Sequence, residues 1–278
     1  MILSEPVESC PVCGNRYVSR IAHRDRYAIE ASFSLCLRCG FIYLNPRPSQ
    51  EAYTEFYERE YRKLVEEYRG PKDLERNQWH YGFALAKFLA DQNILAESVL
   101  DIGGSTGIIA SHVAGNKKGC KVTVVDPCAE ELKQAQSKGF RVLTSTAEEV
   151  RIKGIPHELI LMCRTIDHIR EPRRVLQDIV SEMSKSDVLY LDHCDWLFVA
   201  RREGFTNSLH VDHPSNFTRE SINRLFEQVG LAPFAEYRPP NSTCYGYLLK
   251  RGEHKYLVRE NADTLSEIRR MQSRELDN

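Results

Sequence analysis

The sequence lacks any apolar run near the roughly 20 residues that a membrane-spanning helix needs, so we expect no membrane span. Its first segment, MILSEPVESC, contains neither a basic stretch nor a long apolar one. Secretory signals combine these two features. We therefore expect no signal peptide and a cytoplasmic location for this chain of 278 residues.

The sequence also lacks an excess of charge of either sign. It contains 38 lysines and arginines against 39 aspartates and glutamates, for a net charge of -1. A nearly neutral chain exerts no general attraction on nucleic acid or anionic lipid, so neither is expected as a partner. The length allows one large domain plus a smaller module.

Cysteine, in contrast, is abundant. The nine cysteines are an odd number, which argues against a complete set of disulfides. Four of them form two Cys-x-x-Cys-Gly motifs, at 10–14 and 36–40. The other five lie in apolar segments, where we expect buried thiols that act as small hydrophobic side chains: Cys120, Cys128, Cys163, Cys194 and Cys244.

The two motifs predict one structural zinc site, with Cys10, Cys13, Cys36 and Cys39 as ligands. Two residues between thiolates let both sulfurs bind one ion at about 2.3 Å, and the following glycine permits a tight turn. Four thiolates leave no open coordination position. We therefore expect residues 1–48 to be a zinc-binding module of the ribbon type, in which the ion stabilises a segment that is too short for its own core.

The motifs allow three other interpretations. A redox Cys-x-x-Cys pair would be expected in a strand–helix unit of thioredoxin type, and no such pattern surrounds these cysteines. Two disulfides are the second alternative. A nucleic-acid-binding ribbon is the third, but acidic residues dilute the arginines of this segment.

Residues 49–95 are predicted to form a helical segment between the module and the main domain. Two prolines in NPRPS mark the boundary. The stretch that follows carries Tyr53, Phe56, Tyr57 and Tyr61 near helical spacing. This spacing favours a helix that packs its aromatic face on the main domain, and a lid over a ligand is the alternative. A second helix is expected around Gln78–Gln92.

From residue 96 to residue 250 apolar strands alternate with helical patterns, which predicts an α/β domain with a mostly parallel sheet covered on both faces. A last, antiparallel strand is expected at Thr243–Lys250, followed by a charged helical tail at 251–278. Ligands of such sheets bind beyond the carboxyl ends of the strands. The predicted strands are Ser98–Ile102, Lys121–Asp126, Arg141–Thr144, Leu159–Cys163 and Val188–Asp192, with helices at Ala129–Lys138 and Pro172–Met183.

The stretch SVLDIGGSTGIIASHVAG (Ser98–Gly115) indicates the ligand. It does not contain the G-x-G-x-x-G pattern of dinucleotide-binding proteins. Instead, Asp101 precedes its glycines, and a carboxylate there would repel a pyrophosphate. It suits a cationic ligand without phosphate, such as S-adenosylmethionine (SAM). Asp126, which ends the next strand, is placed to accept hydrogen bonds from both ribose hydroxyls.

The segments VLDIGGSTG, VTVVDP, TAEEV and LMCRTIDHIREPRRVLQDI resemble the successive motifs of class I SAM-dependent methyltransferases. The resemblance covers about Ser98–Gly230 and implies a Rossmann-like sheet. It places the methionine part of the cofactor at the glycine loop, the ribose at the second acid, the adenine at TAEEV, and an arginine on the pocket floor. Ser105 stands where many members have glycine. The implied cofactor-binding residues are Asp101, Gly103, Gly104, Ser105, Gly107, Asp126, Ala147, Glu148 and Arg164.

The N-terminal cysteines, GFIYLNPRP and the tyrosine-rich helix resemble the zinc-binding domain of the sugar C-methyltransferase family, which acts on nucleotide-linked deoxysugars. In that family a Y-x-E-H-x-x-x-F-S stretch supplies the catalytic base. HVDHPSNFT aligns with it: His213 and Phe217 match, Asp212 replaces Glu and His210 replaces Tyr. The resemblance covers two of that family's three domains, because the C-terminal sugar-nucleotide domain has no counterpart here.

Methyl transfer requires an acceptor that is held in line and a group that removes its proton. Histidine suits the second task because its ordinary pKa is about 6.5. The candidates are His168, His210 and His213, with Asp212 to orient an imidazole. For His168 the alternatives are a helix cap or packing against the cofactor, and for His210 and His213 a second metal site.

We therefore expect a SAM-dependent methyltransferase with a structural zinc and a small-molecule acceptor, either a sugar or a nucleotide-sugar-like compound. The alternative is a methyltransferase-like scaffolding protein that recruits a partner through its zinc module. A dehydrogenase is disfavoured by the missing dinucleotide pattern. A polar wall around His210–Phe217 would favour a sugar, and an aromatic, apolar wall would favour a planar acceptor.

Overall fold

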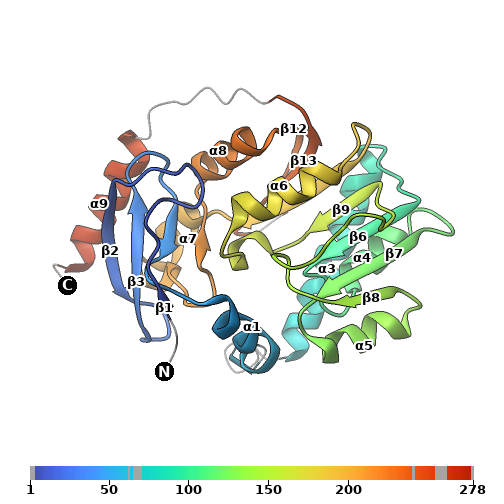
Figure 1. The fold of residues 1–278 in the computed structure, drawn as a ribbon, viewed down its shortest axis with the longest axis horizontal. Coiled ribbons are helices and arrows are strands. Elements are labelled where there is room, and N and C mark those ends of the chain that lie inside the picture. Colours follow the sequence, from blue (N-terminus) through green and yellow to red (C-terminus); the bar gives the residue numbers. More distant parts are fainter. Residues whose placement is uncertain (1–3, 62, 65–70, 240–241, 254–261, 277–278) are drawn as a thin grey trace.

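The computed structural model describes residues 4–276, apart from 62, 65–70, 240–241 and 254–261. Figure 1 shows two sheets side by side, a large one in the main domain and a smaller one built mostly from the N-terminal segment. No helix among these residues is both long enough and apolar enough to cross a bilayer.

The large sheet has seven strands in the order β12-β13-β10-β9-β6-β7-β8. The central pairs from β10 to β8 are parallel, and β13 is antiparallel to both of its neighbours. This confirms the predicted mostly parallel sheet with an antiparallel last strand. The bounds are β6 Ser98–Ile102, β7 Lys121–Asp126, β8 Arg141–Thr144, β9 Leu159–Met162, β10 Val188–Cys194, β12 Leu231–Tyr237 and β13 Cys244–Arg251.

Helices cover both faces of this sheet because its strands are apolar on both sides. Leu100 and Ile102 of β6 pack in the cluster that holds α6 and α8, whereas Val99 packs in the cluster that holds α3, α4 and α5. Burial of each such side chain stabilises the fold by about 1.5–3 kcal/mol. The helices are α3 Pro71–Asp91, α4 Ile108–Ala114, α5 Ala129–Ser137, α6 Pro172–Glu182 and α8 Arg219–Val229.

The smaller sheet has the order β11-β4-β3-β2, and all of its pairs are antiparallel. Its fourth strand, β11, comes from the distant segment in which the catalytic residues were predicted. Two short strands, β1 and β5, pair with each other beside it. The bounds are β1 Ser4–Glu5, β2 Val18–Arg24, β3 Glu30–Cys36, β4 Ile42–Leu44, β5 Arg47–Pro48 and β11 Ser215–Asn216.

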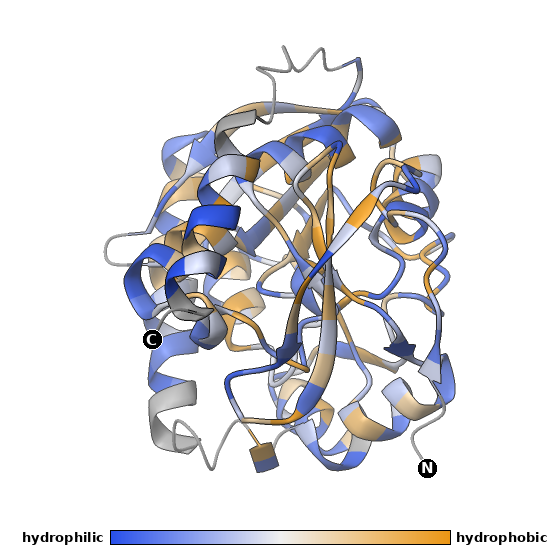
Figure 2. Cartoon of the chain, turned by 90° about the vertical axis from the view of Figure 1, so that its left-hand side faces the viewer, coloured by the Kyte–Doolittle hydropathy of each residue, from blue (hydrophilic) through white to orange (hydrophobic). Residues whose placement is uncertain are grey.

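The N-terminal segment shares its core with later parts of the chain. Phe33 and Leu35 of β3 cluster with Trp196 of α7 (Trp196–Glu203) and with Ile268 of α9 (Ala262–Leu276). Figure 1 shows α9 against the smaller sheet, and in Figure 2 hydrophobic stretches follow the strands in the middle of the view. The predicted tail thus supplies apolar surface to a module that has little of its own.

Helix α1 (Gln50–Arg59) lies between the two sheets (Figure 1). The hydroxyl of Ser49 accepts a hydrogen bond from the backbone N–H of Ala52, which caps the first turn. Buried Tyr53 faces the interior from this helix. The predicted aromatic helix is therefore present, and it stands beside the carboxyl ends of the large sheet's strands.

Candidate active site

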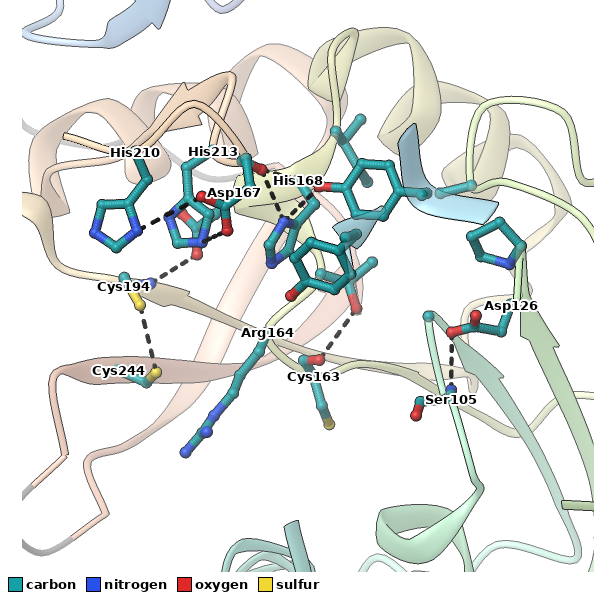
Figure 3. Close-up of a pocket in the computed structure, with 18 of the residues that line it drawn as sticks. Ser105, Asp126, Cys163, Arg164, Asp167, His168, Cys194, His210, His213 and Cys244 are labelled. Atoms are coloured by element: carbon teal, nitrogen blue, oxygen red, sulfur yellow. Dashed lines mark hydrogen bonds and ion pairs between the residues drawn. The ribbon is translucent and has the colours of Figure 1, made fainter. Parts of the chain in front are cut away.

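A cavity of about 670 Å³ opens beyond the carboxyl ends of β6, β7, β9 and β10, between the two sheets. This volume lies within the range of small-molecule sites, about 300–1,000 Å³. Figure 3 shows the cavity with Ser105 and Asp126 at the right and His210 and His213 at the left, and with the Arg164 side chain below the histidines. We refer to these two sides as the cofactor half and the acceptor half.

At two positions of the loop after β6 the neighbouring atoms leave no room for a side chain, so only glycine fits. A Cβ atom on Gly103 would lie 2.5 Å from the Thr165 hydroxyl oxygen, and one on Gly104 would lie 2.5 Å from a carboxylate oxygen of Asp101. Gly103 also has a φ of +76°, which favours glycine. Both glycines line the cavity, as predicted.

Gly107, the third glycine of this loop, packs against a neighbouring helix. It precedes α4 with a φ of +71°, and a Cβ atom there would lie 3.1 Å from Ala135 of α5. It is not among the residues that line the cavity. The absence of a side chain at Gly107 therefore lets helices α4 and α5 approach each other. Its contact with the methionine part of the cofactor stays a prediction.

Asp101 is a buried carboxyl group without a partner. Its side chain is 1% exposed, and neither of its oxygens has a hydrogen-bond partner within the part of the chain that the structure describes. Burial, and secondarily the charge of Asp126, raises its pKa to about 7. An unpaired buried carboxylate is costly, and an ammonium or sulfonium group in the cavity would supply the missing charge.

Asp126 both shapes the loop and faces the cavity. Its two carboxylate oxygens accept backbone N–H groups of Ser105 and Cys128, each at 2.9 Å. A carboxylate oxygen has two lone pairs, so these contacts leave capacity for ribose hydroxyls. Ser105 has a φ of +51°, and its hydroxyl donates to Glu131.

The other predicted cofactor residues also line the cavity. Ala147 and Glu148 lie at its rim, and Glu148 accepts the backbone N–H of Arg170 at 3.0 Å. Arg164 has a φ of +53°, and its guanidinium carbon lies 4.9 Å from the centre of the Tyr81 ring. Buried Asp192 fixes this geometry, because it accepts the backbone N–H of Arg164 and the hydroxyl of Tyr81.

The structure brings together the histidines and the aspartate predicted for the acceptor half. Asp212 lies between two imidazoles, with one carboxylate oxygen 3.8 Å from Nδ1 of His210 and the other 3.8 Å from Nε2 of His213. The rings of His210 and His213 stack at 4.6 Å, and His168 meets His213 edge to face at 4.5 Å. One carboxylate therefore sits within reach of two candidate bases.

Hydrogen bonds define the protonation of two of these rings. Nδ1 of His168 lies 2.9 Å from the backbone oxygen of Asp212, which can only accept, and 2.7 Å from the hydroxyl of Tyr57, which can accept as well. The carbonyl favours a proton on this nitrogen, which leaves a lone pair on Nε2. Desolvation lowers the pKa of His168 to about 4, so it is neutral at pH 7. Nε2 of His210 lies 3.0 Å from the guanidinium of Arg26, which can only donate, and its lone pair is used there.

Several side chains of this half were not predicted as site residues. The hydroxyls of Tyr57 and Tyr53 in α1 donate to the backbone oxygen of Asp212 at 2.9 and 3.2 Å. Helix α1 thus packs against the segment of Asp212 and borders the acceptor half. Arg26 comes from the turn between β2 and β3, and its contact with His210 spans 184 positions of sequence. No local pattern signals such a contact.

The same turn holds the segment in which the catalytic residues are predicted. Asp25 is 2% exposed, and one of its carboxylate oxygens accepts the backbone N–H of Val211 at 2.9 Å. The backbone N–H of Arg26 donates to the carbonyl of Leu209 at 2.9 Å. Together with the pairing of β11 and β4, these bonds make the N-terminal module one wall of the acceptor half.

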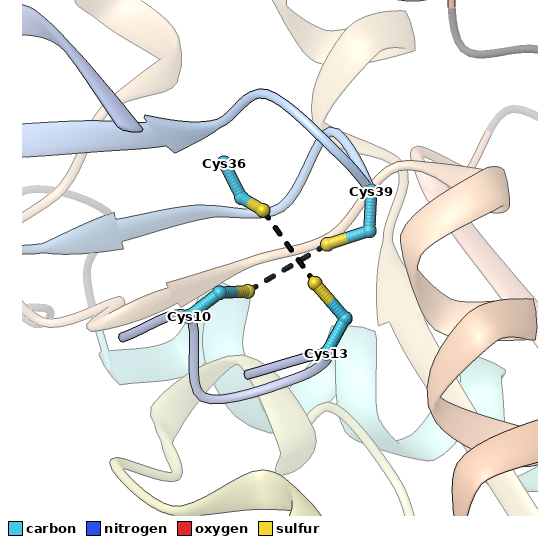
Figure 4. A group of neighbouring side chains, drawn as sticks. All are labelled: Cys10, Cys13, Cys36 and Cys39. Carbon is cyan, nitrogen blue, oxygen red and sulfur yellow. Dashed lines mark hydrogen bonds between the residues drawn. The ribbon is translucent and has the colours of Figure 1, made fainter. Parts of the chain in front are cut away.

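The four N-terminal cysteines converge (Figure 4). The Cys10–Cys39 and Cys13–Cys36 sulfurs are both 3.6 Å apart, and all four sulfurs lie within 4.8 Å of one another. A tetrahedral zinc ion with sulfurs at about 2.3 Å requires sulfur–sulfur distances of about 3.8 Å. The arrangement fits a zinc ion. Hydrogen bonds among the four thiols lower the pKa of Cys36 and Cys13 and raise the pKa of Cys10 and Cys39. The support for zinc is therefore the geometry of the four sulfurs.

The sheet order, the glycine loop between two acids and the cavity at the strand ends define a class of protein, the class I SAM-dependent methyltransferases. Residues 53–236 match the family model described as "Methyltransferase domain", and the chain belongs to this family. No curated protein matches the sequence.

Solved structures share the fold at low identity. The mitomycin 7-O-methyltransferase MmcR is 17% identical with a TM-score of 0.56, and the match covers 72% of this chain and 60% of that one. The plantazolicin methyltransferase BamL, in complex with a triazolic desmethylPZN analog and SAH, is 15% identical with a TM-score of 0.54, covering 72% and 94%. A SAM-dependent methyltransferase from Clostridium acetobutylicum is 14% identical with a TM-score of 0.50, covering 69% and 99%. This chain thus spans less than two thirds of the mitomycin enzyme.

Proposed function

We propose that this protein transfers the methyl group of SAM to a small molecule bound in the acceptor half of the cavity. The observation that carries the proposal is the unpartnered carboxyl group of Asp101, buried beside a glycine loop that side chains would block. A cationic ligand without phosphate satisfies this group, whereas a dinucleotide would bring further negative charge to it.

The residues present fit SAM. Asp101 and Arg164 would face the charged methionine end, Asp126 would accept the ribose hydroxyls, and Ala147 and Glu148 would border the adenine. When bound, SAM supplies an electrophilic methyl group on a sulfonium. The chain's own contribution is to hold the acceptor in line with that group and to remove its proton.

We infer that His213 is the base. The carboxylate of Asp212, 3.8 Å from its Nε2, stabilises the imidazolium that forms when the ring takes the acceptor's proton. Neutral His168 orients the acceptor, since its Nε2 lone pair can accept a hydrogen bond. Arg26 holds the ring of His210 in place.

Single variants test these roles. His213→Gln should lower kcat about 100-fold or more, with unchanged affinity for S-adenosylhomocysteine (SAH). His168→Gln should raise KM more than it lowers kcat. His23→Gln, at an exposed histidine, is the matched control and should behave as wild type. Equal kcat values for the His213 variant and this control would refute the assignment of the base.

The acceptor wall favours a polyhydroxylated molecule such as a sugar. Tyr27, Tyr53 and Tyr57 offer ring faces, but Arg202, Glu203, Ser208 and Asn216 line the same half and can bind hydroxyl groups. A planar acceptor is the second candidate, because the tyrosines provide a stacking surface. Radiolabelled methyl transfer from SAM to nucleotide-linked deoxysugars and to planar phenols separates the two. Transfer only to the phenols would refute the sugar assignment.

We further propose that Cys10, Cys13, Cys36 and Cys39 bind one structural zinc ion. The carboxylate of Asp25 accepts a hydrogen bond from the backbone of Val211, and the backbone N–H of Arg26 donates one to Leu209. These bonds indicate what the ion would stabilise, namely the wall of the acceptor half. A module built into the site in this way also favours an enzyme over a scaffolding protein.

A further inference from the structure

Two cysteines outside the zinc module face each other across neighbouring strands. Cys194 of β10 and Cys244 of β13 are direct partners in the antiparallel register. Their sulfurs lie 3.8 Å apart, and both thiols are free. Both residues line the cavity, and Figure 3 shows them between His210 and Arg164.

The backbone at this pair suits a covalent link. The N–H of Cys194 donates to a carboxylate oxygen of Asp167, and the N–H of Cys244 donates to the hydroxyl of Ser242. Neither N–H bonds to the opposite cysteine, so this is a non-hydrogen-bonded pair of the ladder. In such pairs the Cα atoms are about 4.5 Å apart, which lies within the range of about 4.4–6.8 Å that disulfides occupy.

We propose that Cys194 and Cys244 form an oxidation-sensitive dithiol in the wall of the methyl-transfer cavity, and that hydrogen peroxide converts it reversibly to a disulfide. The thiolate of one cysteine attacks the peroxide, so that the O–O bond breaks, a sulfenic acid forms and the displaced oxygen leaves as water after protonation. The second thiol then displaces the sulfenic oxygen as a second water. Two thiols and one peroxide thus yield one disulfide and two waters, and a thiol reductant reverses the change.

The surroundings support this reactivity. The hydrogen bond from Cys194, and also the charge of Arg164, lowers the pKa of Cys244, which favours the reactive thiolate. Cys163 lines the same cavity, but burial raises the pKa of its thiol well above the ordinary value. Closing the link moves two sulfurs from 3.8 Å to about 2.05 Å. It would tie the end of β10 to β13 at the boundary of the two halves.

Peptide mapping tests the proposal. Reduced, zinc-loaded protein is treated with hydrogen peroxide, its remaining thiols are alkylated, and it is digested without reductant. We expect the peptides of Cys194 and Cys244 to be recovered linked, with a mass lower by two hydrogens than the sum of the two, and dithiothreitol to separate them. The zinc content should stay unchanged.

Serine variants provide the controls. Cys194→Ser and Cys244→Ser should each abolish the linked peptide, whereas Cys163→Ser should retain it. The proposal is overturned if peroxide leaves the wild-type pair unlinked, oxidises either cysteine only to sulfinic acid, or links only the zinc ligands with loss of metal. These readouts involve neither SAM nor methyl transfer, so failure of the proposed enzymatic function would not affect them.

Discussion

Replacing Asp101 by Asn should make the protein more stable at alkaline pH, relative to wild type, than at acidic pH. The pKa of this carboxyl group is raised from an ordinary 3.8 to about 7 by burial and by Asp126. The folded state therefore holds a proton that the unfolded state releases between these values, and wild-type stability falls as pH rises through this window.

The magnitude follows from the two pKa values. The ionisation penalty in the wild type reaches about 4 kcal/mol at pH 8 and about 1.5 kcal/mol at pH 5. An asparagine amide at this position would also lack partners, at a cost of about 1–3 kcal/mol, but this cost does not depend on pH. The stability difference between Asp101→Asn and wild type should therefore shift by about 2–3 kcal/mol in favour of the variant between pH 5 and pH 8.

Urea unfolding of both proteins at the two pH values measures this shift. Glu149→Gln, at an exposed carboxylate, is the control and should show little shift. The same Asp101 variant should bind SAH more weakly, because its ligand-facing charge is gone. A difference that is flat with pH would refute the reasoning that Asp101 is buried without a partner.

The remaining predictions concern the loop, a buried histidine and the metal. The free energy of unfolding of Ser105→Gly, measured in urea, should stay within about 1 kcal/mol of wild type, because the relief of backbone strain at φ +51° offsets the lost hydrogen bond to Glu131. Ser105→Val should be about 2 kcal/mol less stable than the glycine variant in the same measurement. Desolvation lowers the pKa of fully buried His193 to about 4. The free energy of unfolding of wild type should therefore fall by about 2 kcal/mol between pH 7.5 and pH 5, and His193→Gln should not show this loss. Equal losses in the two proteins would contradict this. Wild type should hold about one zinc ion per chain by mass spectrometry, and Cys36→Ser should hold less. The variant should also lose acceptor turnover, while its affinity for SAH changes less than about threefold. Zinc retained at the wild-type level would contradict the metal site.

Local patterns sufficed for the three strands at one end of the large sheet. The strands β6, β7 and β8 have the predicted bounds because each is a short apolar run between turn residues. The acids of the cofactor half were found in the same way, since Asp101 and Asp126 lie in or at the end of such strands. Strand β12 was not predicted, because Pro233 argues against a strand; an edge position with a bulge at this residue accommodates it.

The acceptor half could be predicted only in part. His210, Asp212 and His213 were predicted from a motif within one loop, and His168 was predicted from its place just past a strand. What surrounds them depends on contacts between distant segments, such as the bond from Arg26 to His210 and the pairing of β11 with β4. Gly107 is a second example of what a local pattern leaves out. Its place in the motif predicts a ligand contact, but its packing against Ala135 depends on how two helices meet.

Calorimetric titration with SAH tests the central claim most directly. The account predicts saturable binding of SAH to wild type and no binding of NAD to either protein. Charge-assisted hydrogen bonds to the ribose contribute about 1.5–3 kcal/mol each. The affinity of Asp126→Ala for SAH should therefore be at least about 30-fold lower. Absence of SAH binding to folded wild-type protein, or equal affinity in the Asp126 variant, would contradict it.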